Sequence, residues 1–246
     1  LSNKAIQQKM QIFKKKPKVT FWSTLKNLEK VIKPEPAIKY IPEWFRKSKN
    51  PDQKTLTNVK LCTGLIQYFS KGWIIPLWCD LKVAKNDLGE IFWETPHTEF
   101  KFSFHDDFQY RNLLPEHEKK NIASVIKPNC PFKAEISKGW NLMQQPPYYE
   151  FHNGWSTIPG VFPSSIYHEL NQQIIIYKNF FDGIKPINGV VERVIPIGTP
   201  LIHLIPVPDE FDYEVVEETK DMVSWMIGQR FNKRYHNMIK CPYVKK

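Results

Sequence analysis

The sequence predicts a mainly β protein, α+β overall, in which short antiparallel strands form a jelly-roll-like fold, a sandwich or a barrel. Short apolar or alternating segments recur along the chain, separated by turn residues such as "SKG", "HNG" and "FDG". The 20 prolines and 10 glycines are typical of many short strands with ordered loops, and a few short helices complete the fold. Apolar residues make up 41% of the 246 residues, which is enough for a substantial core.

Residues 1–50 are predicted to form a basic N-terminal arm and a connector. They hold 13 Lys or Arg and 3 Asp or Glu, whereas residues 51–246 hold 22 of each, so the whole net charge of +10 lies in the first fifth of the chain. A charged arm of this kind suits nucleic acid or an acidic protein surface. The candidate nucleic-acid-binding or partner-binding residues are Lys14, Lys15, Lys16 and Lys18.

The first structured elements are expected inside this region. "VTFW" at 19–22 predicts a strand, and Ser23 is positioned to cap a short helix over 24–32. The proline-rich connector that follows contains Trp44 and Phe45 beside two cations. An aromatic pair next to cations packs under a loop or stacks on a nucleic-acid base. We expect the first arrangement, because packing is the commoner outcome.

Residues 51–210 are predicted to form one β-rich globular domain. It begins with a short helix at 63–69 and includes a hairpin turn at 84–90, where "AKNDLGE" has turn-forming residues. Residues 113–124 are polar and are expected to include one helical turn. The predicted strands are 72–83, 91–95, 99–107, 125–137, 140–151, 157–162, 172–178, 190–195 and 200–207.

Residues 211–246 are predicted to form a C-terminal helix and tail that pack on this domain. The longest helical pattern in the chain is "EETKDMVSWMIGQRFNKRY" at 217–235. Its apolar stripe consists of Val223, Met226, Ile227 and Phe231.

Composition also bounds the cellular setting. No stretch of about 18 apolar residues occurs, so we expect no membrane-spanning helix, and the basic start of the chain lacks the apolar segment of a signal peptide. The four cysteines are far apart and form no paired zinc-ligand motif. We therefore expect reduced thiols in a cytoplasmic setting.

One pattern suggests a metal site. His105 and Asp107 are two residues apart at the end of a predicted strand, and His168 follows downstream. Non-haem iron oxygenases use two histidines and a carboxylate in this way, and Lys178 is placed to pair with a ketoacid co-substrate. The alternative is that His105 lies on the solvent-exposed face of its strand and binds no metal.

Two further features are candidate sites. The segment from Tyr148 to Trp155 is rich in aromatic residues and is a candidate lining for a small-molecule pocket; the alternative is a loop buried by its own rings. His203 lies inside the apolar run 200–207, where both strand faces are mostly apolar. We interpret His203 as a structural histidine with a satisfied buried ring rather than a ligand or catalyst.

Part of the chain, residues 125–207, resembles the core of the dUTPase and dCTP deaminase family. Gly160, Val161 and Tyr167 match one family motif. The second motif is matched by Gly198, Leu201, Ile202, Leu204 and Ile205, with His203 at the place of a glutamine. The resemblance implies a compact, mostly β, jelly-roll-like domain that forms trimers.

The catalytic motifs of that family are missing. Its catalytic aspartate would fall near Pro163, and neither Ser164 nor Ser165 can replace a carboxylate base. The Arg-Ser-Gly phosphate motif and the Gly-rich C-terminal tail are also absent. The resemblance therefore implies the fold and argues against the family's activity.

A second resemblance covers most of the chain. "KPKVTFWST", "GWIIPLWCDL", "GWNLMQQPPYYEF" and "GTPLIHLIPVPDEFD" are similar to segments of a protein family, without an assigned activity, from contractile-tailed marine phages that infect cyanobacteria and related ocean bacteria. This resemblance implies a viral origin, synthesis in the host cytoplasm, and a place in the virion as a further option.

Three functions follow from these observations. The first is a non-enzymatic phage protein, a virion structural or assembly component that binds other phage proteins or itself and needs no cofactor. The alternatives are a nucleotide-binding or nucleotide-metabolism enzyme with a dUTPase-like core, and the iron oxygenase. We favour the first, because the chain has no nucleophile elbow and no Gly-rich phosphate loop. Nucleic-acid binding through residues 1–50 is compatible with it.

Overall fold

The computed structural model describes residues 16–47, 62–147, 154–164, 168–170, 172–210 and 212. The chain divides into two compact units. Unit 1 comprises Leu1–Pro34 and Ile75–Asp209, and unit 2 comprises Glu35–Ile74 and Glu210–Lys246. The predicted helix at 217–235 lies outside the described residues.

In the part of the chain that is described, no helix has the length and apolar character needed to cross a membrane.

The first sheet of unit 1 has the strand order β1-β8-β12, and all its pairs are antiparallel. Its strands are β1 (Val19–Ser23), β8 (Phe132–Ile136) and β12 (His168–Glu169). The predicted strand at 19–22 is thus confirmed, but the helix after it is only α2 (Leu28–Val31). Ser23 does not cap this helix. Its hydroxyl accepts from the Leu25 amide at 3.1 Å and so forms a local turn before the helix begins.

The second sheet has the order β10-β13-β7-β6. Its strands are β10 (Trp155–Thr157), β13 (Ile174–Tyr177), β7 (Ile122–Pro128) and β6 (Phe102–Phe104). Ile174 and Ile176 in β13 and Ile126 in β7 have no exposed surface, and β13 is paired on both edges. The predicted strand at 172–178 is confirmed, and the one predicted at 99–107 is reduced to three residues.

The third sheet of unit 1 is built on β9 (Trp140–Gln145), which pairs on one edge with β11 (Gly160–Phe162) and on the other with β15 (Pro200–Pro208). The predicted strand at 200–207 is confirmed. Both of its faces are buried over 201–204, where exposure is at most 1%. The Thr157 hydroxyl donates to the Leu201 carbonyl at 3.2 Å, which links β10 of the second sheet to β15.

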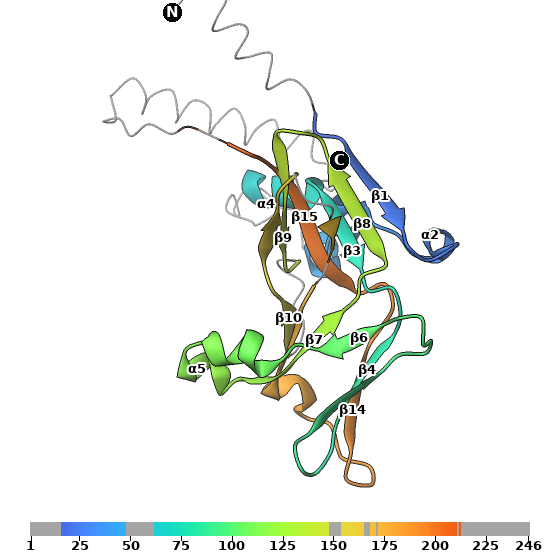
Figure 1. Ribbon diagram of the computed structural model, residues 1–246, viewed down its shortest axis with the longest axis vertical. Helices are drawn as coiled ribbons and strands as arrows, with labels where there is room; N and C mark the ends of the chain where they lie inside the picture. The colour runs from blue at the N-terminus through green and yellow to red at the C-terminus, as the bar shows by residue number, and fades with distance from the viewer. Residues whose placement is uncertain are drawn as a thin grey trace, which may run out of the picture. The chain divides into compact units, whose positions relative to one another are not determined.

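A fourth sheet has the order β14-β4-β5 (Figure 1). Its strands are β14 (Val191–Ile195), β4 (Leu81–Lys85) and β5 (Ile91–Glu94). The predicted hairpin turn at 84–90 is confirmed: the Asn86 side-chain oxygen accepts from the amides of Leu88 and Glu90, and Gly89 has φ +82°. Beside it, Asn188 and Gly189 both have positive φ and join a two-residue turn between Ile187 and Val190.

Three predicted strands are wrong in one respect, because each is two strands. The segment 72–83 divides into β3 (Trp73–Pro76) and β4, 125–137 into β7 and β8, and 157–162 into β10 and β11. In every case the chain leaves one sheet and enters another. A proline lies at or beside each break: Pro76 is the last residue of β3, and Pro131 and Pro159 lie between the two strands of the other pairs. A proline has no N–H for the ladder, so the strand ends where the chain changes sheet.

Unit 2 is smaller and contains the chain's larger helices among the described residues. Its elements are β2 (Glu35–Pro36), η1 (Ala37–Tyr40), α3 (Glu43–Lys47), α4 (Thr63–Ser70) and the start of β3. Phe45 is 1% exposed and packs edge-to-face on Phe69 with ring centroids 5.1 Å apart. The predicted packing of this aromatic pair is thus confirmed for Phe45, while Trp44 stays 38% exposed.

Short helical turns complete unit 1 and leave the protein mostly β, as predicted. They are η3 (Asp107–Gln109), η4 (Arg111–Leu113), α5 (Glu116–Lys119) and η5 (Lys178–Phe181). The turn α5 is the one expected within 113–124. Both α5 and η5 lie at ends of strands of the second sheet, α5 just before β7 and η5 just after β13.

Candidate functional site

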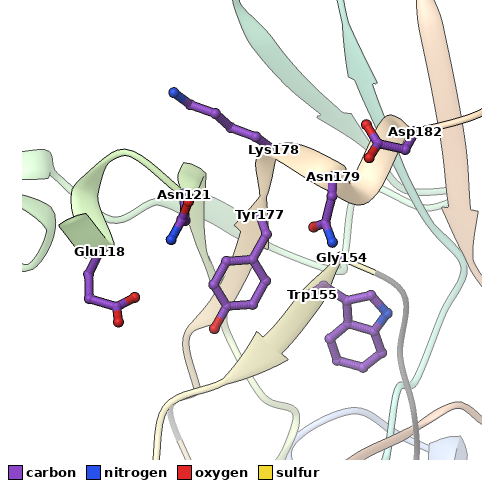
Figure 2. A pocket seen from close by; sticks show the side chains of 8 residues that line it. All are labelled: Glu118, Asn121, Gly154, Trp155, Tyr177, Lys178, Asn179 and Asp182. Carbon is purple, nitrogen blue, oxygen red and sulfur yellow. The ribbon is translucent and has the colours of Figure 1, made fainter.

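A cavity of about 660 Å³ lies in unit 1 where α5, β10, β13 and η5 meet (Figure 2). This volume is within the usual range for small-molecule sites. The lining residues combine aromatic rings, amides, carboxylates and one ammonium group. They are Glu118, Asn121, Gly154, Trp155, Tyr177, Lys178, Asn179 and Asp182.

An irregularity in the β13–β7 ladder places Tyr177. Ile176 pairs with Ser124, but Tyr177 pairs with Ile122, so Ala123 is an extra residue on β7. The shift brings the large Ile122 side chain opposite Tyr177, and Tyr177 packs against the buried group of Ile122, Val125 and Ile175. A bulge of this kind turns the end of a strand. Here the extra residue lies in β7 opposite the end of β13, where Tyr177 lines the cavity.

Close backbone contacts hold the segments on either side of Tyr177. The Tyr177 amide donates to the Gly154 carbonyl at 2.7 Å, and the Lys178 amide donates to the Asn121 carbonyl at 2.8 Å. Gly154 has φ +80°, and a β-carbon there would overlap the Phe180 backbone. Glycine is therefore required where β10 meets η5.

Two buried rings fix the short helix η5. Phe180 and Phe181 are 1% and 5% exposed. The Arg193 guanidinium donates to the Phe180 carbonyl at 3.0 Å and lies 5.3 Å from the Phe180 ring centre, while the Lys85 ammonium lies 5.2 Å from that of Phe181. These contacts tie η5 to β14 and β4, so the exposed side chains that it presents to the cavity start from a fixed backbone.

A second tyrosine supports the wall of the cavity. Tyr110 packs on the same buried group as Tyr177. Burial raises the pKa of Tyr177, and the neighbouring Tyr110 and Glu118 raise it further; burial and then Glu118 likewise raise the pKa of Tyr110. Both phenols therefore stay protonated at neutral pH and can donate hydrogen bonds.

Several polar groups of the cavity are free to bind a ligand. Within the described part of the chain, the side chains of Asn121, Asn179 and Asp182 have no hydrogen-bond partner. Each amide offers two donors and an acceptor, and the carboxylate offers acceptors only. Figure 2 shows the Tyr177 ring between Asn121 and Glu118 on one side and Asn179 and Trp155 on the other. The arrangement can hold a small molecule with several hydroxyl or amide groups.

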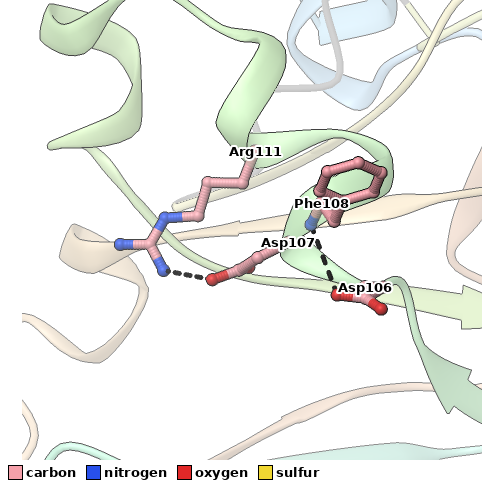
Figure 3. A network of polar contacts seen from close by, with 4 residues as sticks. All are labelled: Asp106, Asp107, Phe108 and Arg111. Carbon is pink, nitrogen blue, oxygen red and sulfur yellow. Dashed lines mark hydrogen bonds and ion pairs between the residues drawn. The ribbon is translucent and has the colours of Figure 1, made fainter.

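The predicted metal ligands are engaged in other contacts where their side chains are described. His105 Nδ1 lies 2.7 Å from Gln109 Oε1, and the ring stacks on Tyr110 with centroids 6.5 Å apart. Asp107 pairs with Arg111 at 3.3 Å (Figure 3). The adjacent Asp106 carboxylate accepts from the Phe108 amide at 3.3 Å and caps η3.

The third candidate ligand, His168, is in β12, where its backbone pairs with Ala134; its side chain is outside the described residues. Among the side chains that are described, no group of three or more His, Cys, Asp or Glu is placed to hold a metal ion. Lys178, the suggested ketoacid partner, lines the cavity instead.

The remaining candidate residues that the structure describes do not line the cavity. His203 is 1% exposed in β15, opposite Gln145 in the β9 ladder. Lys16 and Lys18 are exposed at the start of the described chain, and Lys14 and Lys15 lie outside it. The Lys18 amide donates to the Ser137 hydroxyl at 2.9 Å, which holds the entrance to β1.

Sequence patterns indicated only part of the cavity. The aromatic segment Tyr148–Trp155 was a candidate lining, and its last two residues do line the cavity; residues 148–153 are outside the described range. The other walls come from 118–121 and 177–182, which no motif marks. The available signal was the polar pair Lys178-Asn179 directly after the apolar run "IIIY" and before "FF".

No family model matches the chain, and no curated protein matches it. Among solved structures, the chain is similar to a mutant dUTPase from phage phi11 of S. aureus, with a TM-score of 0.36 and 12% identity, over 82% of this chain and 99% of that one. It is also similar to a mutant dUTPase of Staphylococcus bacteriophage 80alpha with dUpNHpp, with a TM-score of 0.36 and 11% identity, over 82% of this chain and 90% of that one. No role of an individual residue follows from a likeness at this level.

Proposed function

We propose that this chain is a non-enzymatic binding protein whose cavity beside Tyr177 takes a small, neutral, polar molecule. One observation carries the proposal: free amide and carboxylate groups of Asn121, Asn179 and Asp182 surround an aromatic ring whose backbone is fixed on both sides. Polar groups around an apolar surface are the usual design of a ligand site.

The composition of the wall supports binding rather than catalysis. Among the described residues, those that line the cavity include no serine, threonine, cysteine or histidine; their ionisable groups are carboxylates, one ammonium group and one phenol. Tyr177 is held protonated, which suits donation to a ligand. Nucleophilic catalysis of the serine or cysteine type therefore has no group to use among the described lining residues.

The charges of the wall favour a neutral ligand over a nucleotide. Glu118 and Asp182 are carboxylates, and Lys178 is the single cation among the lining residues that the structure describes. A triphosphate is bound by clustered cations, backbone N–H groups or a metal. Two carboxylates beside one lysine would repel it, so the nucleotide-handling alternative is the weaker one.

A panel of small molecules tests this proposal. Thermal unfolding of the full chain is followed with neutral polar compounds of several classes, and binding raises the melting temperature. Asn179→Ala removes a free amide and should reduce the shift. Asn112→Ala is the matched control, because Asn112 is exposed in η4 and does not line the cavity. A panel without any Asn179-dependent shift contradicts the proposal.

A role as a virion or assembly component is compatible with this binding function and is part of the proposal. The favouring observation is the concentration of the whole net charge in residues 1–50, an arm suited to phage proteins or nucleic acid. Mass spectrometry of purified phage particles and assembly intermediates tests it, and absence from both counts against it. A homotrimer, which the dUTPase-like core implies, is tested by light scattering of the purified chain.

A further inference from the structure

We infer that the ligand of the Tyr177 cavity is a neutral saccharide unit, with one face of its ring on Tyr177 and its hydroxyls bound by Asn121, Asn179 and Asp182. The inference rests on the proposed binding function and names the ligand class.

The aromatic surface is the first step. The Tyr177 ring projects from the end of β13 into the cavity (Figure 2). A sugar ring carries its polar groups around the rim and C–H groups on its faces. The face of an aromatic ring is electronegative and attracts C–H groups, so the two surfaces match. Ile122, Val125 and Ile175 pack beneath Tyr177 and hold the ring in place.

The polar rim is the second step. A hydroxyl group both donates and accepts, and vicinal hydroxyls present these functions in pairs. Asn121 and Asn179 each offer an amide oxygen beside an NH₂ group, and Asp182 offers two acceptor oxygens. These groups approach from two elements on different sides of the tyrosine ring (Figure 2). They can therefore bind hydroxyls at different edges of one sugar ring.

The exposure of the polar side chains in the cavity favours a saccharide over a nucleoside as the ligand. Asn121, Asn179 and Asp182 are all exposed, so a ligand held by them stays partly in water. A nucleobase gains affinity mainly by stacking and by reading of its polar edge in a closed site. A sugar unit keeps its outer hydroxyls hydrated and can be one residue of a longer glycan. The open, polar cavity fits the second case.

The charged side chains of the cavity favour neutral sugars over phosphorylated sugars. Glu118 and Asp182 face the same cavity as the single Lys178. An additional phosphate would meet two carboxylates for one ammonium group. We therefore expect neutral hexosides to bind better than their phosphates.

Saturation-transfer NMR on the full chain tests the inference. The probes are the methyl glycosides of glucose, galactose, mannose and N-acetylglucosamine, with glucose 6-phosphate, uridine and adenosine for comparison. We expect transfer to the ring C–H protons of at least one neutral glycoside. Asn179→Ala should weaken its binding roughly three- to tenfold, the loss of one hydrogen bond. Asn112→Ala, which changes an exposed amide that does not line the cavity, should bind it nearly as the parent does.

The outcomes distinguish the two levels of the proposal. Uridine or adenosine binding that depends on Asn179, without glycoside binding, overturns the saccharide inference and leaves the binding function standing. Glycoside binding that is equal in Asn179→Ala and Asn112→Ala overturns the assignment to this cavity. Absence of binding by every probe here and in the broader thermal panel overturns both.

Discussion

Gly154 lies so close to Phe180 that a β-carbon on Gly154 would overlap the Phe180 backbone. This contact joins β10, at one wall of the cavity, to η5, at another. Gly154 also has φ +80°, which side chains other than glycine rarely adopt.

Gly154→Ala should destabilise unit 1 by about 2–5 kcal/mol, because backbone strain and overpacking act together. Urea unfolding followed by tryptophan fluorescence measures the change. Gly139→Ala is the matched control: Gly139 has φ +84° but nothing within 4 Å of the added carbon. That variant should lose only about 1–2 kcal/mol from strain. Equal losses in the two variants would show that the Phe180 contact does not matter.

Arg193→Met should loosen η5. The substitution removes the 3.0 Å hydrogen bond to the Phe180 carbonyl and the cation over the Phe180 ring, at a cost of about 2 kcal/mol. Hydrogen exchange of the amides in 178–181 should become faster.

Lys82→Met, in the neighbouring strand β4, is the control for Arg193→Met. Lys82 makes exposed ion pairs with Glu94 and Glu192, whose loss should change stability by less than about 1 kcal/mol. Unchanged exchange at 178–181 in Arg193→Met would refute the anchoring role.

The raised pKa values of Tyr110 and Tyr177 predict that the folded protein loses stability at alkaline pH. Burial and then neighbouring Tyr110 and Glu118 raise the pKa of Tyr177 above its unfolded value, so the folded state holds this proton more tightly. The contribution is complete below about pH 10 and is lost as the pH rises through the folded pKa. The free energy of unfolding should therefore fall above about pH 10, and less steeply in Tyr177→Phe.

Glu118→Gln separates the two causes of the tyrosine shifts. Removing the carboxylate should lower the pKa of Tyr110 and Tyr177, while burial keeps both raised. Glu116→Gln, which changes an acid in α5 that pairs with Lys119, should leave the tyrosines unchanged. Tyrosinate absorbance titrates the phenols in the parent and both variants. Identical curves for the two glutamine variants would contradict the role of Glu118.

The cysteines should differ sharply in reactivity. Burial raises the pKa of Cys130 and Cys79 to about 12, whereas Cys62 is exposed. Thiolate is the reactive form, so in a Cys241→Ser background a maleimide should label Cys62 at once and the other two only on unfolding. Intact-protein mass spectrometry counts the labels. Rapid double or triple labelling of the folded chain would contradict the buried placement.

The strands were largely predictable because alternation and turn residues are local signals. The breaks at Pro76, Pro131 and Pro159 were missed, although the prolines were visible. A proline predicts an interruption of the hydrogen-bond ladder, but it does not predict that the next residues join a different sheet. The Asn188-Gly189 turn was also missed, although Asn-Gly is the strongest short hairpin signal.

The cavity was less predictable, for a physical reason. Its walls come from 118–121, 154–155 and 177–182, and they meet because β13 pairs with both β10 and β7. Such long-range pairing leaves no spacing pattern in the sequence. The sequence shows the aromatic residue Trp155, but it does not show which other residues line the cavity with it.

Ala123 adds one residue to β7 but has no partner in β13, so the length of β7 can change without a change in the pairing of the residues on either side. Ser124 and Ile122 already face successive residues of β13, as they would in a chain one residue shorter. Deletion of Ala123 therefore conserves every pair in the ladder while it removes local twist. The distance between α5 and η5 would change, and the isoleucine core would not. Insertion or deletion of one residue at position 123 can thus change the size of the cavity while the strand pairing stays the same. A structure of the deletion variant would measure the change.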